Sequence, residues 1–347
     1  MVQLANALQK RGARVDLVPG SATGAYLDRV DEGVRLVDLG QARVSRAVLP
    51  LARYLRRARP KALLATMNHA NVAAVLATTL ARTRNQLVLR EANCVGGQLD
   101  DARSWRTHAA IRSIRFAYRR ANRVVGVSRD VAADLVEVLG VSESSVEVIY
   151  NPVDFPLLEE QAAHPLAPVV GMTGSERLIV SVGRLAEHKD HLTLLRAMPT
   201  VLAAHPDVHL LIMGEGEMRP ALEAEISRLG LESHVSLPGF LDNPFPFVAR
   251  AEVMAHPSRR EGLPNSLIQS IALGTPVVAV DGPGVAEALE GSGLGTLVGV
   301  GDAEGLGRAI SGVLSAPASA DRVVPTAWRD RFTLDGIVDR YAEALGL

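Results

Sequence analysis

The chain has 347 residues, of which 48% are hydrophobic, and its formal net charge at pH 7 is -1. This length and composition predict two globular domains with cores of their own, and the near-neutral charge argues against wholesale binding of nucleic acid, which needs a strongly basic domain. The single cysteine, Cys94, excludes an internal disulfide and is typical of a reducing compartment, so we expect the protein in the cytoplasm.

The charged residues are distributed unevenly. Residues 1–152 hold 23 Lys and Arg against 13 Asp and Glu, so this half is basic and the remainder is acidic. A basic half is expected either to face an anionic surface or substrate, or to carry a solvated basic face. No stretch of the sequence approaches the roughly 20 apolar residues of a spanning helix, and polar residues interrupt the N-terminus where a signal peptide needs an apolar core.

Short apolar runs alternate with longer stretches of helical period, a pattern typical of parallel α/β sheets. In the first half we expect strands at residues 14–18, 62–66, 86–90, 123–127 and 145–149, and helices at 48–59 and 105–121. In the second half we expect strands at residues 178–182, 208–213, 235–238, 253–256, 277–280 and 295–298.

The two sets of strands are separated by a segment of different composition. Prolines crowd the stretch between Pro152 and Arg177, which has no clean period and predicts an interdomain linker. We therefore expect an N-terminal Rossmann-like domain over residues 1–152, a linker over 153–176, a C-terminal Rossmann-like domain over 177–325 and a closing helix over 326–347.

The turn after the predicted strand 178–182 presents two cations, Arg184 and Lys189. They stand at the carboxyl end of a parallel strand, where such sheets bind ligands, and Asp190 is expected to cap the next helix. A guanidinium can hold a phosphate with two donors, and an ammonium adds a point charge. The spacing alone leaves both a phosphate site and a surface turn with solvated charges open.

A second turn follows the predicted strand 253–256 and places Glu261, Gly262 and Pro264 just before a helix. A helix N-terminus attracts phosphate, and the Glu261 carboxylate is suited to accept hydrogen bonds from sugar hydroxyls. The alternative is that Glu261 only compensates the helix dipole.

Taken together, these segments closely resemble glycosyltransferase family four, the retaining family with the GT-B fold. The family's Gly-Arg-Leu turn with its lysine is matched by Gly183, Arg184 and Lys189, and its Ser-Arg-x-Glu-Gly-x-Pro-Asn stretch by residues 258–265. Further matches are the Gly-x-Gly loop at 214–216, Gly-Phe at 239–240 with Asn-Pro at 243–244, and Asn-Pro-Val-Asp at 151–154.

The resemblance implies an enzyme with two Rossmann-like domains and a cleft between them. Its implied reaction moves a hexose or N-acetylhexosamine from a nucleotide diphosphate sugar to a polysaccharide or lipid-linked acceptor, with retention of configuration. Arg184 and Lys189 would stabilise the leaving diphosphate without a metal or other cofactor, and Glu261 would hold the donor sugar. The implied donor-binding residues are Gly183, Gly214, Gly239, Phe240, Gly262, Leu263, Pro264, Asn265 and Gln269.

The sequence departs from the family at two side chains. Gln269 stands where the family has a second glutamate that receives the ribose hydroxyls, so we expect donor binding to be weaker by about 1 kcal/mol. The family's Glu-His-Asn triplet reads Glu91-Ala92-Asn93 here. His69 is therefore a candidate for the missing histidine, together with Glu91 and Asn93 on the acceptor side; the alternative is that His69 only begins a helix.

A third departure is at the start, where Met1 opens directly into a helix. In the family a central strand and a glycine-rich loop precede this helix, so we expect the N-terminal domain to be incomplete. Two other functions stay open. One is a GT-B nucleotide-sugar epimerase, which the match around Glu261 disfavours. The other is a non-catalytic homologue that binds a nucleotide sugar or a partner, which Gln269, Ala92 and the missing start favour.

Two predicted helices of the first half are rich in arginine, one over residues 105–123 and one ending in the basic stretch 53–61. The first mixes its arginines with apolar side chains. We expect a peripheral contact with the inner face of an anionic cytoplasmic membrane, where each cation contributes about 1 kcal/mol. The alternative is a pair of ordinary helices that cover the sheet and turn arginine toward solvent.

Overall fold

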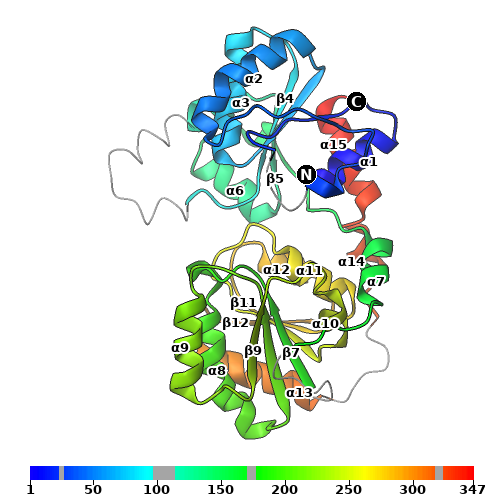
Figure 1. Ribbon diagram of the computed structural model, residues 1–347. Helices are drawn as coiled ribbons and strands as arrows, with labels where there is room; N and C mark the ends of the chain where they lie inside the picture. Colours follow the sequence, from blue (N-terminus) through cyan, green and yellow to red (C-terminus); the bar gives the residue numbers. More distant parts are fainter. Residues whose placement is uncertain (23–26, 97–113, 170–176, 317–322) are drawn as a thin grey trace. The chain divides into compact units, whose positions relative to one another are not determined.

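A computed structural model describes residues 1–22, 27–96, 114–169, 177–316 and 323–347 (Figure 1). The contacts divide the chain into two units, which are described separately. Unit 1 comprises Met1–Pro152 and Phe332–Leu347, and unit 2 comprises Val153–Arg331. Most of the arginine-rich helix predicted over residues 105–121 lies outside the described residues.

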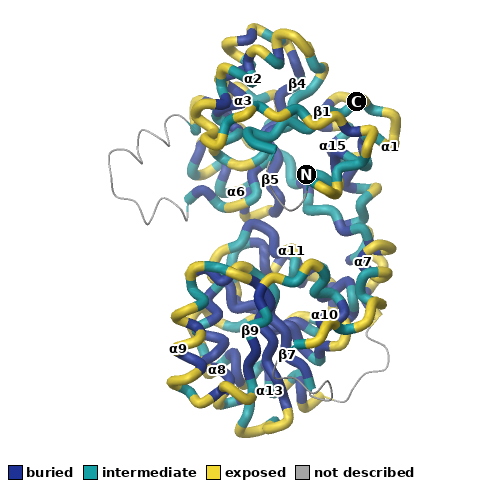
Figure 2. The backbone as a smooth tube through the Cα atoms, in the orientation of Figure 1, coloured by how far each residue is buried: buried dark blue, intermediate teal, exposed yellow. Residues whose placement is uncertain are grey.

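Unit 2 is built on a six-stranded parallel sheet with the order β12-β11-β10-β7-β8-β9. The strands are β7 (Arg177–Val182), β8 (Val208–Met213), β9 (Val235–Gly239), β10 (Val253–His256), β11 (Val277–Val280) and β12 (Gly295–Val298). The six strands predicted for this half are confirmed. Strands β8, β10 and β11 are predictable because they are buried along their whole length and are therefore mostly apolar, with only His209 in β8 and His256 at the end of β10 as polar residues. Figure 2 draws much of this sheet as buried backbone.

Helices cover both faces of this sheet. The main core packs the sheet against α8 (His191–Ala204), α9 (Arg219–Leu229) and α13 (Ala303–Ser315). The other helices of the unit are α7 (Phe155–Ala162), α10 (Phe245–Arg250), α11 (Asn265–Ala272), α12 (Val285–Leu289) and α14 (Thr326–Asp330).

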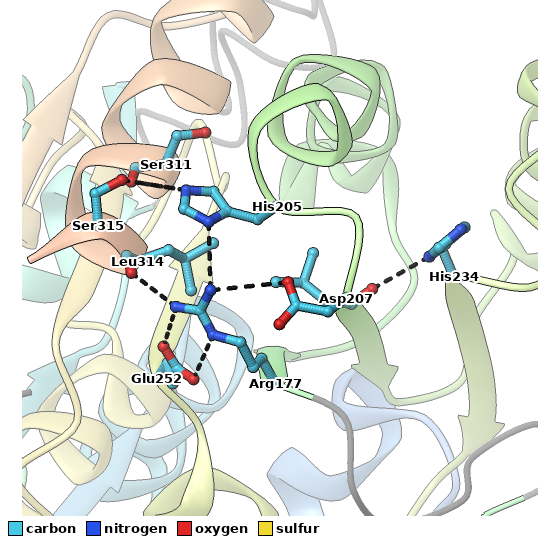
Figure 3. Close-up of polar contacts among 9 residues, drawn as sticks. Arg177, His205, Asp207, His234, Glu252, Ser311, Leu314 and Ser315 are labelled. Carbon is cyan, nitrogen blue, oxygen red and sulfur yellow. Dashed lines mark hydrogen bonds and ion pairs between the residues drawn. The ribbon is translucent and has the colours of Figure 1, made fainter.

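A polar cluster joins the helices to the sheet at its amino edge (Figure 3). Arg177, the first residue of β7, binds the Glu252 carboxylate with Nε and Nη2 at 2.8 and 2.6 Å and also donates to the carbonyl of Leu314 at 2.7 Å. His205, just after α8, lies 3.3 Å from Arg177 and 3.2 Å from the carbonyl of Ser311. These contacts hold α8 and α13 against β7 at the edge away from the predicted site.

The segment predicted as a linker, 153–176, begins with helix α7. Its side chains Phe155 and Leu158 are buried, and α7 packs against α10. Asp154 caps the helix by accepting from the N–H of Leu157 at 3.2 Å. Pro156 is tolerated because it lies in the first turn, where its missing N–H costs no helical hydrogen bond. Proline therefore marks the start of a helix in the first part of the segment predicted as a linker.

Unit 1 contains two separate parallel sheets among its described residues. Strands β3 (Ala62–Thr66), β4 (Gln86–Glu91), β5 (Arg123–Gly126) and β6 (Val146–Val148) form one in that order, and β1 (Asp16–Leu17) pairs with β2 (Arg35–Leu36) in the other. The helices of this unit include α1 (Val2–Lys10), α2 (Val44–Ala58), α3 (Asn68–Ala81), α6 (Arg129–Glu137) and α15 (Leu334–Leu345). The expected strand and loop ahead of α1 stay a prediction.

The C-terminal segment predicted as one closing helix over 326–347 is two helices. The first, α14, belongs to unit 2, where Trp328 is buried and its Nε1 donates to the carbonyl of Ala288 at 2.8 Å. The second, α15, packs with α1 against the sheet of unit 1, and Tyr341 and Leu8 lie in that shared core.

A substitution at Gly284 tests the packing of the loops at the carboxyl edge of unit 2. Gly284 has φ of +72°, and a Cβ added there would lie 2.1 Å from the carbonyl oxygen of Gly262. We expect Gly284→Ala to lower the free energy of unfolding by about 1–3 kcal/mol. The matched control is Gly312→Ala within α13, where an added Cβ meets nothing within 4 Å and helix propensity favours alanine by about 1 kcal/mol. Equal urea midpoints for the two variants would contradict this packing.

Candidate functional site

The residues predicted from the second-half motifs meet where the strand order of unit 2 reverses. From β7 the chain passes outward to β8 and β9, and it then returns to β10 on the other side of β7. Ligands bind outside the carboxyl ends of open parallel sheets at such a reversal. Arg184 and Lys189 follow β7 and Glu261 follows β10, so the topology brings them to the same place.

Close backbone contacts that involve glycines fix the positions of these loops relative to the sheet. Gly183 donates its N–H to the carbonyl of Met213 at 3.0 Å, and Gly214 donates to the carbonyl of Gly239 at 2.9 Å. Gly214 has φ of +153°, and a Cβ on it would lie 1.9 Å from the carbonyl oxygen of Gly183. A side chain at Gly214 would therefore push the Arg184 turn away from the sheet. Phe240, directly after Gly239, is 60% exposed.

Lys189 and Glu261 form a largely buried ion pair. The Lys189 Nζ donates to Oε1 of Glu261, and the two side chains are 19% and 12% exposed. His256, the last residue of β10, is 3% exposed and places Nε2 3.4 Å from the same oxygen. Burial alone would raise the pKa of Glu261, but His256 and Lys189 outweigh it and lower this pKa to about 2. Glu261 is therefore a carboxylate at neutral pH.

Arg184 differs from Lys189 in its surroundings. It is exposed, and its side chain makes no hydrogen bond or ion pair with the residues that the structure describes. An exposed guanidinium beside a buried ammonium supplies two cations at one strand end. The arrangement suits an anion that arrives from solvent.

Asp190 occupies the N-cap position of α8, but the expected cap does not form. Its carboxylate accepts from Arg259 Nε at 2.7 Å and from the hydroxyl of Thr193 at 2.7 Å, and no backbone N–H donates to it. Arg259 also donates its own N–H to the carbonyl of His188 at 2.9 Å. Asp190 has φ of +50°, not the extended backbone typical of a capping residue. Its bond to Arg259 instead fastens the loop after β10 to the loop after β7.

The start of α11 faces the same loops. Pro264 stands at its N-cap and offers no side-chain acceptor to the N–H groups of the first turn. Gly262, Leu263 and Pro264 are buried, Asn265 is exposed and Gln269 is partly buried in the second turn. An N-terminus without a capping side chain binds an anion through its backbone N–H groups.

The acceptor-side candidates lie at the carboxyl edge of unit 1. Glu91, the last residue of β4, is 2% exposed and accepts from the Tyr118 hydroxyl at 2.5 Å. Burial raises the pKa of Glu91, while Tyr118 and the N–H groups of Ala92 and Asn93 oppose the rise. Tyr118 in turn accepts from Asn71 Nδ2 at 2.7 Å. Glu91 therefore belongs to an interior network.

His69 and Asn93 do not share that network through their side chains. Both are exposed, His69 in the first turn of α3 and Asn93 after β4, and among the described residues no hydrogen bond or ion pair joins His69 to Glu91. The neighbouring strands β3 and β4 place the three at one edge of the sheet. Their acceptor-side role stays a prediction.

Sequence reasoning missed the buried polar residues behind both sites. Tyr118 and Asn71 support Glu91, and His191 and His256 lie near the Lys189–Glu261 pair. His256 had a signal, since a histidine at the end of an otherwise apolar strand must find a polar partner. Within the described residues, no set of three or more His, Cys, Asp and Glu side chains is placed to hold a metal ion, and no helix has the length and apolar character to cross a membrane.

Two family models match the chain. The one described as Glycosyltransferase Family 4 matches residues 1–155, and the one described as Glycosyl transferases group 1 matches residues 176–316. The chain belongs to the family-four-like glycosyltransferases. The resemblance drawn from the motifs is thereby confirmed.

Curated relatives are glycosyltransferases by name. One relative is the N-acetylgalactosamine-N,N'-diacetylbacillosaminyl-diphospho-undecaprenol 4-alpha-N-acetylgalactosaminyltransferase of Campylobacter jejuni. The chain is 34% identical to it over 168 residues, and this aligned segment covers 48% of this chain and 44% of that protein. The chain is 32% identical over 171 residues to the lipopolysaccharide core biosynthesis glycosyltransferase LpsE of Rhizobium meliloti, with 48% and 49% covered. The matched segment spans about half the length of these relatives or less.

Solved structures match over nearly the whole chain. Anabaena HepE in complex with UDP aligns with a TM-score of 0.78 at 19% identity, over 99% of this chain and 94% of that one. A glycosyltransferase from Rickettsia africae aligns with a TM-score of 0.78 at 17% identity, over 99% and 92%. The likeness shows the fold, and the predicted GT-B class is confirmed.

The lowered pKa of Glu261 predicts a pH-dependent contribution to stability. The pKa moves from 4.5 to about 2, so the ionised carboxylate stabilises the fold above about pH 4.5 and this contribution is lost as the pH falls toward 2. We expect Glu261→Gln to lower the free energy of unfolding at pH 7 by about 1–3 kcal/mol. Urea unfolding at a series of pH values should show the deficit shrinking below pH 4.5.

Glu304→Gln is the control for that series, because Glu304 is 75% exposed on α13. Glu304→Gln should change the free energy of unfolding by close to zero at every pH, as is usual for exposed ion pairs. A deficit of Glu261→Gln that is the same at pH 7 and at pH 3 would show that the carboxylate charge does not stabilise the fold.

Proposed function

We propose that this chain transfers a hexose or N-acetylhexosamine from a nucleotide diphosphate sugar to a polysaccharide or lipid-linked acceptor, with retention of configuration. The observation that carries the proposal is the meeting of Arg184, Lys189 and Glu261 with the start of α11 at the strand reversal of unit 2. Cations and helix N–H groups suit a diphosphate, and a carboxylate suits sugar hydroxyls.

The names of the relatives support this choice of donor and acceptor. The Anabaena structures hold UDP and UDP-glucose, which favours a uridine diphosphate sugar. The Campylobacter relative is named for a diphospho-undecaprenol substrate and the Rhizobium relative for lipopolysaccharide core biosynthesis. A lipid-linked or lipopolysaccharide acceptor is consistent with both names.

Charge accounts for the proposed catalysis. Negative charge grows on the diphosphate as the bond to the sugar breaks, and fixed cations stabilise it where it develops. Lys189 has three N–H donors and gives one to Glu261, which leaves the others for the diphosphate. Arg184 adds a guanidinium from solvent. These residues supply the stabilisation without a metal, and Gln269 in place of a glutamate would weaken the hold on the ribose by about 1 kcal/mol.

Arg184→Ala and Lys189→Ala test this proposal. Each variant should bind UDP about tenfold to a hundredfold more weakly, because a charge-assisted hydrogen bond contributes about 1.5–3 kcal/mol. Calorimetric titration with UDP, with and without EDTA, measures the loss and should give the same affinity in both buffers. Arg308→Ala removes an exposed arginine of α13 as the control. Unchanged UDP affinity in Arg184→Ala, or affinity abolished by EDTA, would contradict the proposal.

Turnover separates the enzyme from its alternatives. Incubation with UDP-sugars and lipid-linked acceptors should yield a glycosylated acceptor. An epimerised donor without acceptor glycosylation would identify an epimerase, and UDP binding without either product would identify a non-catalytic homologue, which Gln269 and the engaged Glu91 favour.

We further propose that unit 1 contacts the cytoplasmic face of an anionic membrane. Arg115, Phe116, Arg119 and Arg120, here called the basic patch, line an open depression of about 440 Å³. Phe116 is 51% exposed, and the Arg120 guanidinium lies 4.0 Å from the centre of its ring. An exposed aromatic ring among arginines suits the boundary between headgroups and acyl chains.

Charge reversal tests the basic patch. We expect Arg119→Glu to reduce sedimentation with phosphatidylserine vesicles at low salt several-fold, because each cation near an anionic surface contributes about 1 kcal/mol. Arg308→Glu makes the same charge change in unit 2 and should leave sedimentation unaltered. Equal sedimentation with neutral vesicles, or no effect of Arg119→Glu, would contradict the membrane contact.

A further inference from the structure

His256 is a buried polar residue that core packing does not explain. It ends β10, whose other residues are Val253, Met254 and Ala255, and it is 3% exposed. Its Nε2 makes no hydrogen bond of good geometry within the described residues. An unsatisfied buried donor costs about 1–3 kcal/mol, so a histidine at this position needs a compensating partner.

The partner that the geometry offers is Glu261. Its Oε1 lies 3.4 Å from His256 Nε2 and also accepts from Lys189 Nζ. Both contacts fall on one oxygen, and Oε2 has no hydrogen-bond partner among the described residues. The carboxylate is therefore held through one oxygen, while the other has no partner among the described residues.

A second buried histidine completes the surroundings of the pair. His191, the first residue of α8, is 4% exposed, and its Nδ1 has no partner among the described residues. Burial, together with the smaller effects of His256 and Lys189, lowers the pKa of His191 to about 3. His191 is thus a neutral side chain at pH 7 and adds no competing cation to the Lys189–Glu261 contact.

We propose that His256 is a positioning residue for the transferred sugar: its Nε2–H and the Lys189 ammonium fix Oε1 of Glu261, so that Oε2 accepts hydrogen bonds from the sugar hydroxyls. This role rests on the proposed function, and His256 lies outside the motifs that predicted the site. The anionic Oε2 repels phosphate and attracts hydroxyl donors. His256 therefore acts on the sugar part of the donor and leaves the diphosphate contacts alone.

The test compares UDP-glucose with UDP in calorimetric titrations of the full chain. The His256→Asn side chain is too short to bring its N–H to the place of Nε2, whereas the His256→Gln side chain can reach it. We expect His256→Asn to weaken UDP-glucose binding about fivefold relative to wild type, because Oε1 of Glu261 loses its contact with Nε2, and to leave UDP affinity unchanged. His256→Gln should bind both like the wild type.

His209→Asn is the matched control. His209 lies on β8, is 2% exposed and contacts the Ser236 hydroxyl at 2.9 Å. His209→Asn should not weaken UDP-glucose binding more than it weakens UDP binding. Equal losses for UDP and UDP-glucose in His256→Asn, no loss, or no rescue by His256→Gln would overturn the positioning role while UDP binding persists. A wild-type chain that binds neither ligand would instead contradict the proposed function, and the positioning role would fall with it. Melting curves confirm that each variant is folded.

Discussion

The contact between Lys189 and Glu261 joins two loops that are 72 residues apart in the chain. It can form only because the strand order reverses at β7, which makes β7 and β10 neighbours. Taking two charges out of water is costly unless they are paired, so the loops must close on each other for the pair to be stable. The bonds of Arg259 to Asp190 and to the carbonyl of His188 close the same two loops.

The contact between the two loops places groups for two kinds of ligand side by side. The cations suit a diphosphate and the Glu261 carboxylate suits hydroxyls. Lys189 contributes to both sets of contacts, because it also forms the ion pair with Glu261. The glycines allow the arrangement, since backbone meets backbone at Gly183 and Gly214 and again at Gly262 and Gly284. A donor that carries both a diphosphate and a sugar matches the whole set better than either part alone.

Local patterns predicted much of the fold, and the residues that they singled out in the second half lie together at the carboxyl edge of the unit 2 sheet. Strands β8, β10 and β11 were predictable because burial on both faces requires mostly apolar runs bounded by turns. Strand β2, Arg35–Leu36, was missed because it has only two residues, one polar and one apolar, both exposed, and so shows no hydrophobic pattern. Helix α7 was missed because its proline suggested a linker. The contacts of Arg259 with Asp190 and of Tyr118 with Glu91 were missed because the partners come from distant segments, and spacing along the chain holds no record of such contacts.

A crystal structure of the chain with UDP tests the central claim most directly. The account predicts the diphosphate within hydrogen-bond distance of the Arg184 guanidinium, the Lys189 ammonium and the first N–H groups of α11, with Glu261 still held at Oε1. UDP bound elsewhere on the molecule, with Arg184 left in solvent and the start of α11 vacant, would contradict it.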